Sequence, residues 1–473
     1  MKKISKNTII ITALVALLPF VSCKKWLDVQ PEDKFTEKQI FSTRQGIADA
    51  LNGIYLEMGK ERLYGANLTS TVLDIFAQRY NVNSLHDFSK YQTYTFDDKN
   101  VKARLDGMWT QTYINVVNAN KFIQNLDAYP GVLDKQTDSL FRGEAYALRA
   151  FLQFDMLRLF GPVYRTADST KTAIPYYTTA GTDVSEILPA NQIMQKVIAD
   201  LNTAEILLNG DPIKKVGVIK SANYNYLTYR NYRLNYYAVK GLQARVYLYR
   251  GDKVSALAAA KSVIDNATKF PWITTGQVLS DKINPNRVFT GEILFGLQTL
   301  DLYDVHRDYF APDLQDKSIL APSDARLKTT FENNENDYRY NPNWMLTGIG
   351  GKSYKTFFKY ADIIDKKLDY RLTISLLRLS EMYYIAAESE QNAGYLNTVR
   401  NNRGLLNLPP TANLTTELLK EYQKEFFGEG QLFYYYKRMN SATIPNPLAT
   451  SGSITMNATK YVVPLPLSEL TPR

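Results

Sequence analysis

The residues that could perform acid–base or metal chemistry are few in this chain. It contains only two histidines, His86 and His306, which lie far apart in stretches without helical periodicity. A zinc site or a histidine-based catalytic triad needs several such side chains close together. We therefore expect two solvated histidines and no metal site.

Carboxylates offer the other route to catalysis. The pairs Glu335/Asp337 and Asp97/Asp98 could supply the two carboxyl groups of a glycosidase, which lie about 5–10 Å apart. Neighbouring acids in loops are usually solvated, however, and GIGGKS at 348–353 lacks the strand-to-helix setting of a phosphate-binding loop. We predict a protein that is not an enzyme and has no cofactor. A hydrolase with an unrecognised carboxylate site is the alternative.

Binding a sugar requires less than catalysis does. Aromatic rings can cover the C–H faces of a sugar, while Asn, Asp, Arg and Lys hydrogen-bond its hydroxyls. Two stretches without helical period, 78–101 and 270–369, are rich in such residues, and long ordered loops are commonly functional. Each candidate has packing within its loop as an equally good alternative role. The candidate ligand-binding residues are Arg79, Tyr80, Asn81, Tyr91, Tyr94, Trp272, Tyr303 and Trp344.

The composition describes a soluble globular protein that is rich in tyrosine. The chain has 473 residues, of which 45% are hydrophobic, 22% are charged and 34 are tyrosine. The formal charge of +9 falls to +6, with 53 basic and 47 acidic residues, when Lys2, Lys3 and Lys6 are left out with the N-terminal segment. Because there is no run of basic residues, we expect no nucleic acid as a partner.

The first 22 residues have the pattern of a secretory signal peptide. Three lysines precede an apolar run from Ile9 to Val21, which is too short to span a bilayer comfortably. Ser22 then precedes Cys23, the only cysteine of the chain, in a pattern that resembles a bacterial lipobox. A lone cysteine is often a small buried hydrophobe, but this position favours lipidation. We therefore predict a membrane anchor on Cys23, to which each buried CH₂ contributes ~0.8 kcal/mol.

The segment 141–163 predicts the most regular helix. Its apolar residues recur three or four apart along one face and also occupy other faces, so other helices must cover it. Gly161 and Pro162 end the helix, because glycine suits the left-handed position after a helix and proline cannot continue it. The charged residues that need a partner in such a covered helix are Glu144, Arg149 and Arg158.

Helical periodicity recurs over much of the remaining chain. Small residues on both sides of a turn at Gly251 predict two antiparallel helices within 235–267, in part like a tetratricopeptide repeat. The predicted strands are 292–297 and 354–360. The other predicted helices cover 42–55, 68–77, 107–126, 193–206, 371–391, 395–403, 414–427 and 431–439.

The order and spacing of several motifs resemble the SusD/RagB nutrient-binding lipoproteins of Bacteroidetes outer membranes, over essentially the whole chain after Cys23. The motifs that carry the resemblance include WTQTYINVVNANKFI at 109–123, RGEAYALRAFLQFDMLRLFGPV at 142–163, LLRLSEMYYIAAES at 376–389, LNTVRNNRG at 396–404, EFFGEG at 425–430 and VVPLPLSEL at 462–470. The resemblance implies a mainly α fold, in which a tetratricopeptide-like helical-repeat scaffold of about four helix pairs carries an irregular loop-rich lobe with a few short strands. The implied segments are a signal peptide at 1–22 and a SusD-like protein at 23–473, with the helical scaffold at 40–267 and 371–440 and the irregular lobe at 268–370.

The resemblance also implies a function. Members of this family bind a nutrient, usually a glycan or oligosaccharide, at the cell surface and pass it to a SusC-like TonB-dependent transporter. We therefore expect an outer-membrane protein, lipid-anchored through Cys23 and facing the cell exterior, with that transporter as its partner. Two alternatives stay open, namely a peptide as the ligand and a helical-repeat scaffold that binds only protein partners.

Overall fold

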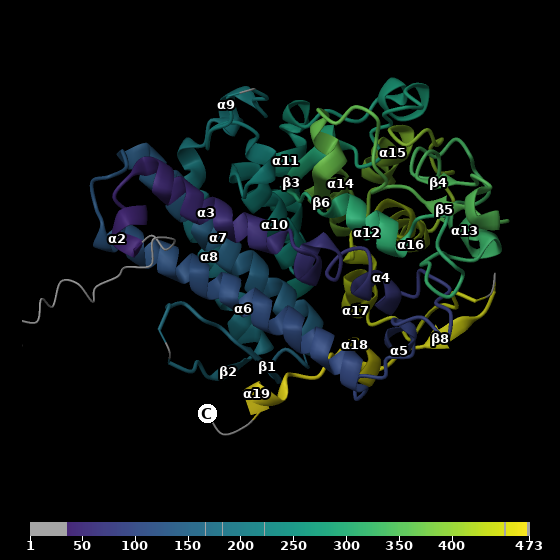
Figure 1. The fold of residues 1–473 in the computed structure, drawn as a ribbon, viewed down its shortest axis with the longest axis horizontal. Coiled ribbons are helices and arrows are strands. Elements are labelled where there is room, and N and C mark those ends of the chain that lie inside the picture. The colour runs from purple at the N-terminus through teal and green to yellow at the C-terminus, as the bar shows by residue number, and fades with distance from the viewer. Residues whose placement is uncertain (1–35, 166, 182, 222, 449–450, 471–473) are drawn as a thin grey trace, which may run out of the picture.

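Helices dominate the structure, and its strands form two-stranded pairs (Figure 1). This computed structural model describes residues 36–165, 167–181, 183–221, 223–448 and 451–470. The predicted signal peptide and Cys23 lie outside the described residues.

The longer helices build the scaffold, and the shorter elements lie at its edges and in the lobe. The longer helices are α3 (Arg44–Met58), α6 (Lys99–Ala128), α7 (Lys135–Phe160), α8 (Ala190–Leu207), α10 (Tyr236–Arg250), α11 (Lys253–Ile264), α14 (Leu379–Glu390), α15 (Ala393–Asn401), α16 (Leu414–Glu425) and α17 (Gln431–Met439). The shorter helices are α2 (Glu37–Ile40), α4 (Val72–Phe76), α5 (Ser89–Gln92), α9 (Ile213–Val216), α12 (Leu302–Tyr309), α13 (Asp324–Thr330), α18 (Ala458–Tyr461) and α19 (Leu467–Leu470). The strand pairs, all antiparallel, are β1 (Thr172–Pro175) with β2 (Ile187–Pro189), β3 (Ile293–Gln298) with β6 (Thr373–Arg378), β4 (Trp344–Met345) with β5 (Thr356–Phe357), and β7 (Thr443–Pro445) with β8 (Ser453–Thr455).

The helix α7 is buried along most of its length, as its sequence predicts. Asp134 caps its N-terminus by accepting a hydrogen bond from the backbone N–H of Thr137 at 2.9 Å. The helix ends at Phe160, but the predicted left-handed conformation of Gly161 is wrong, because φ is −73° and ψ is 170°. Close packing explains the glycine, since a Cβ there would lie 2.5 Å from the carbonyl oxygen of Leu157.

The three charged residues of this helix that were expected to need partners, Glu144, Arg149 and Arg158, all have buried partners, which confirms that prediction. Such pairs are required because an unpaired charge in a protein core is strongly unfavourable. The ion pairs are Glu144 with Arg230 and Arg233, Arg149 with Asp200, and Arg158 with Asp155.

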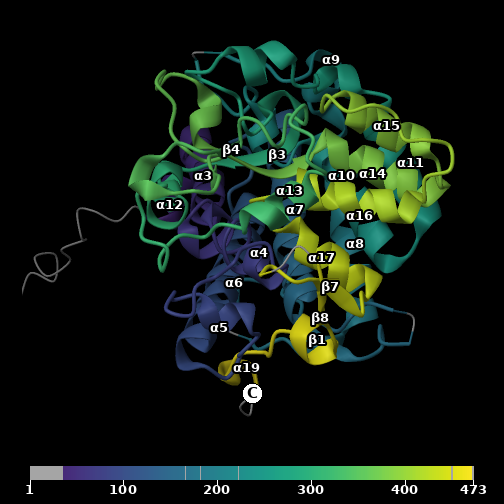
Figure 2. The same cartoon turned by 90° about the vertical axis from the view of Figure 1, so that its right-hand side faces the viewer.

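Successive helices pack on one another to form the scaffold. The order of contact is α6 on α7, α7 on α8, α8 on α10, α10 on α11, α11 on α14 and α14 on α15. The predicted hairpin is confirmed: Gly251, with φ of 89°, makes the left-handed turn between α10 and α11. Figure 2 shows α10 and α11 together with α14, α15 and α16 on its right-hand side. The mainly α, tetratricopeptide-like fold is confirmed.

The beginning of the helix predicted at 371–391 is instead the strand β6. It pairs with β3, with Phe295 opposite Leu377 and Gln298 opposite Thr373. A short apolar run does not distinguish a buried strand from a helix by periodicity, and pairing with a distant strand decides it. The predicted strand at 292–297 is confirmed as β3, while only Thr356–Phe357 of the strand predicted at 354–360 is regular.

Two other predicted helices differ from the observed ones in their boundaries. The helix predicted at 68–77 is regular only over α4, and α6 starts at Lys99, before the predicted residue 107. Asp98 explains this early start, because its side chain accepts hydrogen bonds from the backbone N–H groups of Asn100 and Val101. The predicted loop from 78 to 101 therefore ends at this cap and contains the short helix α5.

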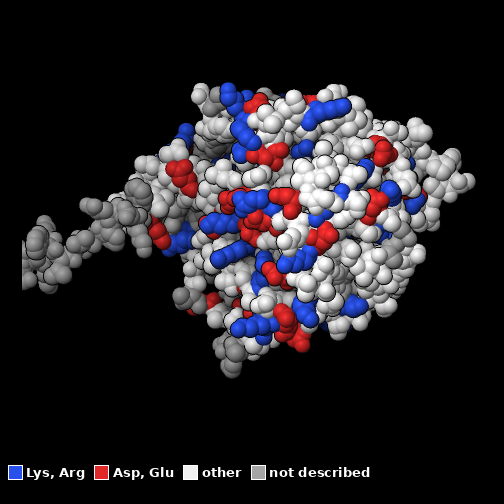
Figure 3. All heavy atoms as spheres, turned by 45° about the vertical axis from the view of Figure 1, so that its right-hand side comes forward, with Lys and Arg blue, Asp and Glu red and all other residues white. Residues whose placement is uncertain are grey.

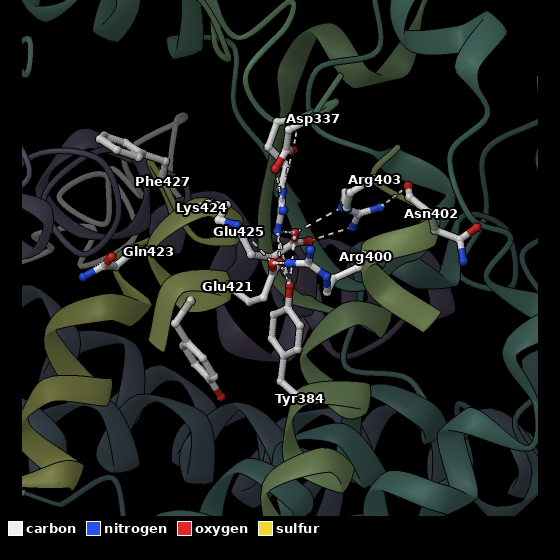
Figure 4. Close-up of polar contacts among 12 residues, drawn as sticks. Asp337, Tyr384, Arg400, Asn402, Arg403, Glu421, Gln423, Lys424, Glu425 and Phe427 are labelled. Carbon is white, nitrogen blue, oxygen red and sulfur yellow. Dashed lines mark hydrogen bonds and ion pairs between the residues drawn. The ribbon is translucent and has the colours of Figure 1, made fainter. Parts of the chain in front are cut away.

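A buried network of opposite charges joins the loop-rich lobe to the C-terminal helices (Figure 4). Arg403, after α15, contacts Glu292 of the lobe and Glu425 of α16, each at 2.6 Å. Arg339 of the lobe contacts Glu421 of α16 at 2.6 Å. These pairs fix the lobe on the scaffold and so position the loops described below.

Candidate functional site

The loop that follows α4 is held in place by Arg79, which the sequence suggests as a ligand-binding residue. Its guanidinium donates to the carbonyl oxygen of Gln423 at 2.7 Å and lies 4.1 Å above the ring of Phe427. Its Nε lies 3.3 Å from a carboxylate oxygen of Asp74. Arg79 is buried, so in this conformation it is a structural anchor between the loop and α16.

The three tyrosines suggested from the same loop are buried as well. Their hydroxyl groups donate to backbone carbonyl oxygens, which satisfies the polar end of each side chain inside the protein. The hydrogen bonds are Tyr80 to Ser70 at 2.8 Å, Tyr91 to Asn100 at 3.2 Å and Tyr94 to Phe76 at 2.6 Å. These tyrosines pack the loop and present no face to a ligand in this conformation.

The candidates in the lobe differ in how far their side chains are buried. Trp344 is 1% exposed and packs 4.8 Å from the rings of both Phe357 and Phe427. Trp272 is half-buried against Tyr383 at 5.3 Å. Tyr303, on α12, is 45% exposed and remains available to a ligand.

Asn81 is a predicted residue that lines one of the larger cavities. Its backbone N–H donates to the carbonyl oxygen of Ala321 at 2.9 Å, which brings the loop against the lobe. A cavity of about 420 Å³, here called the lobe cavity, opens at this junction. Its lining residues are Asn81, Asn83, Asp316, Ile319, Ala321, Pro322, Ser323, Asp324, Ser353 and Tyr354. In Figure 1, the elements α4, α5, α13 and β5 lie on the same side of the molecule, away from α3 and α8.

The charged groups of the lobe cavity are compensated by neighbouring lysines. Asp316 accepts from Lys352 Nζ at 2.7 Å and from the Tyr354 hydroxyl at 2.8 Å. The hydrogen bond from Lys352 lowers the pKa of Asp316, so this carboxylate is charged at neutral pH. Asp324 is paired with Lys328 at 2.7 Å. The cavity therefore offers carboxylate and amide groups, one aromatic ring and little net charge.

Sequence reasoning missed most of this lining. Asn83, Asp316 and Tyr354 are polar or aromatic residues in irregular segments, as the chosen candidates are. Their burial and their distance from Asn81 depend on how the lobe folds against the loop. Of these residues, Asn83 lies two positions after Asn81 and could have been chosen with it.

The two histidines are buried, so the prediction that they are solvated is wrong. His86 Nε2 lies 3.1 Å from the carbonyl oxygen of Ser318 and helps to join the loop to the lobe. Burial and the nearby Arg287 guanidinium lower the pKa of His306 to about 4, so it is neutral at physiological pH. In the described part of the chain, no group of three His, Cys, Asp or Glu side chains is arranged to hold a metal ion.

Among the carboxylates considered for a glycosidase, three have contacts that explain them without catalysis. Asp337 is buried and paired with Arg339 at 2.6 Å, whereas Glu335 contacts Lys355 at 3.3 Å. Asp98 caps α6. The segment 348–353 forms a short 3₁₀ turn rather than a strand-to-helix loop.

The surface has mixed charge on the face drawn in Figure 3, where lysine and arginine are interspersed with aspartate and glutamate. Among the described residues, no helix is both long and apolar enough to cross a membrane.

Comparisons with known proteins agree with this architecture. Residues 25–248 match a family model described as SusD-like, starch-binding and associating with the outer membrane. SusD-like protein P38 of Formosa agariphila is 23% identical over 93% of both chains. SusD-like protein P2 of the same organism is 28% identical, but the match spans 55% of this chain and only 46% of P2.

Solved structures of SusD-like proteins share the fold of this chain. A SusD superfamily protein from Bacteroides thetaiotaomicron superposes with a TM-score of 0.69 at 22% identity, covering 90% of this chain and 97% of the other. A laminarin-binding SusD-like protein gives a TM-score of 0.66 at 18% identity, covering 91% and 97%. The family model over residues 25–248 and the relatives that match in sequence lead to one conclusion: this chain is similar to SusD-like proteins.

Proposed function

We propose that this protein is a lipid-anchored glycan-binding protein of the outer membrane that captures an oligosaccharide in the lobe cavity and passes it to a SusC-like TonB-dependent transporter. The observation that carries the proposal is the junction of Asn81 with the lobe, which places Asn83, Asp316 and Tyr354 around one cavity. The family description as starch-binding and the laminarin-binding structural relative support a glycan as the ligand class.

The chemistry of the lobe cavity suits reversible binding. Amide and carboxylate oxygens accept hydrogen bonds from sugar hydroxyls, and amide N–H groups donate to them. The ring of Tyr354 and the apolar face of Pro322 can cover the C–H face of a sugar. Asp316 accepts a hydrogen bond from Lys352, which lowers the pKa of this carboxyl group, so Asp316 is not held as a protonated general acid.

Calorimetric titration with oligosaccharides of starch and laminarin tests the binding site. We expect Asn81→Ala and Tyr354→Ala each to weaken binding at least ten-fold, which corresponds to about 1.4 kcal/mol. Tyr303→Ala is the matched control, because Tyr303 is exposed but does not line the lobe cavity. Unchanged affinity in folded Asn81→Ala and Tyr354→Ala proteins would remove the lobe cavity as the site.

Co-purification tests the partner and the ligand class. The protein is extracted from outer membranes in mild detergent through a C-terminal tag, and the bound chains and small molecules are identified by mass spectrometry. A stoichiometric TonB-dependent barrel supports the transporter role, and a trapped peptide would replace the glycan. Recovery of other protein partners without a ligand would favour a scaffold.

The proposed anchor has its own test. Cys23→Ala should release the protein from the membrane fraction, because the diacyl chains supply the binding energy. A variant that stays membrane-bound, or a mature chain that begins at another residue, would rule out lipidation at Cys23.

A further inference from the structure

A second and larger cavity of about 600 Å³ lies between α3, the segment 224–233 and the end of β3. It shares no lining residue with the lobe cavity. We call it the tyrosine cavity, because its lining contains Tyr55, Tyr224, Tyr226, Tyr229 and Tyr232. None of these residues is needed for the site proposed above.

Three of these tyrosines form a stack at the cavity. The rings of Tyr224 and Tyr229 are 4.8 Å apart and inclined by 13°, and those of Tyr229 and Tyr232 are 6.2 Å apart and inclined by 18°. Tyr224 is 69% exposed and ends the stack, so burial in the core does not explain its position. An exposed aromatic surface of this kind is typical of a contact site.

The stack is held by a rigid base. Tyr229 adopts a left-handed backbone conformation, with φ of 48°, which is unfavourable for a residue other than glycine. Its N–H donates to the carbonyl oxygen of Ile219 at 2.8 Å, and the next residue, Arg230, is fully buried in ion pairs with Asp211 and Glu144. The Tyr232 hydroxyl is 2.9 Å from Thr373 Oγ1. The tyrosines are therefore pre-positioned before any ligand arrives.

The two arginines that line the tyrosine cavity are both paired with carboxylates. Arg44 is paired with Asp134, and Arg233 is paired with Glu144 at 2.8 Å. A charged ligand would have to compete with these carboxylates for the arginines, at a cost in desolvation. A neutral ligand meets no such cost.

Amide groups supply the remaining polar lining. The side chains with amide groups that border the cavity are Gln45, Asn52, Asn225 and Gln298. Asn52 accepts a hydrogen bond from Arg233 through its oxygen, and its amide N–H groups have no hydrogen-bond partner among the described residues. Amides can both donate to and accept from the hydroxyl groups of a sugar.

We propose that the tyrosine cavity is a second binding site for a neutral saccharide. Tyr224 supplies the ring face, and Asn52 with the neighbouring amides hydrogen-bonds the hydroxyls. The inference takes only its ligand class from the proposed function, and it concerns a different cavity. Two sites on one chain would hold a long glycan more tightly than either site alone, provided that the glycan spans both.

The test uses the purified full-length protein in mild detergent. An array of neutral and acidic oligosaccharides first selects the neutral oligosaccharide that binds best, and calorimetry then follows that compound. The double variant Asn81→Ala/Tyr354→Ala inactivates the lobe cavity and should retain binding. Adding Tyr224→Ala should weaken the remaining binding at least ten-fold, whereas adding Tyr224→Phe, which keeps the ring, should change it less than three-fold.

The outcomes separate this inference from the proposed function. If Tyr224→Ala leaves the binding of the double variant unchanged, or if the double variant has no binding left, the tyrosine cavity is not a saccharide site. If the double variant binds as the wild type does and Tyr224→Ala alone abolishes binding, the tyrosine cavity stands and the lobe cavity does not. Binding of acidic oligosaccharides alone, or of no oligosaccharide, would overturn this inference.

Discussion

Arg403 and Glu425 form a fully buried ion pair at 2.6 Å, and they belong to two motifs that lie in separate parts of the sequence. Arg403 is in LNTVRNNRG at 396–404, and Glu425 begins EFFGEG at 425–430. Glu425 also contacts Arg378 and Arg339, so three arginines surround one carboxylate. The two motifs therefore serve one structural purpose, which is to join α15, α16 and the lobe.

Glu425→Gln should strongly destabilise the protein. It removes the negative charge that compensates three buried arginines, and breaking a buried pair in this way costs about 3–5 kcal/mol. Urea or thermal unfolding measures the loss. Arg307→Gln is the control, because Arg307 forms exposed pairs with Asp304 and Asp308 and should leave the unfolding midpoint unchanged. Equal midpoints for both variants would show that the network does not hold the lobe.

Acid should weaken the same network. Burial alone would raise the pKa of Glu421, but the charges of Arg339, Lys424 and Arg400 lower it to about 2. Because the folded pKa lies below the unfolded value, Glu421 stabilises the protein above about pH 4.5, and this contribution is lost as the pH falls towards 2. The midpoint of unfolding, measured between pH 7 and pH 2, should fall more steeply for the wild type than for Glu421→Gln. Parallel profiles would contradict this assignment.

Lys437 should stabilise the end of α7 even when it is uncharged. It is fully buried, and its Nζ donates to the carbonyl oxygens of Leu159 and Gly161 at 3.0 and 2.7 Å. Lys437→Met leaves these carbonyls without that donor and should cost about 1–3 kcal/mol of stability.

The pH dependence of Lys437 follows from its burial. Burial lowers its pKa well below 10.5, so the unfolded chain binds more protons than the folded protein between the lowered pKa and 10.5. The stability of the wild type relative to Lys437→Met should therefore increase as the pH rises through that range. Unfolding measured in urea at several alkaline pH values checks the sign, and a decreasing difference would contradict it.

Trp344 should prove to be a core residue. Trp344→Ala removes a buried indole between Phe357 and Phe427 and should destabilise the protein by about 3–5 kcal/mol. Tyr303→Ala, at an exposed position, should change stability by less than about 0.5 kcal/mol. Wild-type stability of Trp344→Ala would return Trp344 to the list of ligand-binding candidates.

The sequence by itself determined the helical scaffold. The apolar period of α7, its end before Gly161 and the turn at Gly251 are local features, and local periodicity is sufficient to predict them. The need for partners of the charged residues in α7 also follows from the sequence, because a buried charge must be paired whatever the fold. The identity of those partners, such as Arg230 for Glu144, does not follow from the sequence.

Only the tertiary structure decided which loop residues face a cavity. Tyr80 and Asn81 are neighbours in the chain, yet Tyr80 is buried under its own loop and Asn81 lies against Ala321 of the lobe. The strand β6 likewise depends on its distant partner β3. The residue type determines whether a side chain can bind a sugar. Whether that side chain is exposed depends on the distant segments of the chain that pack against it.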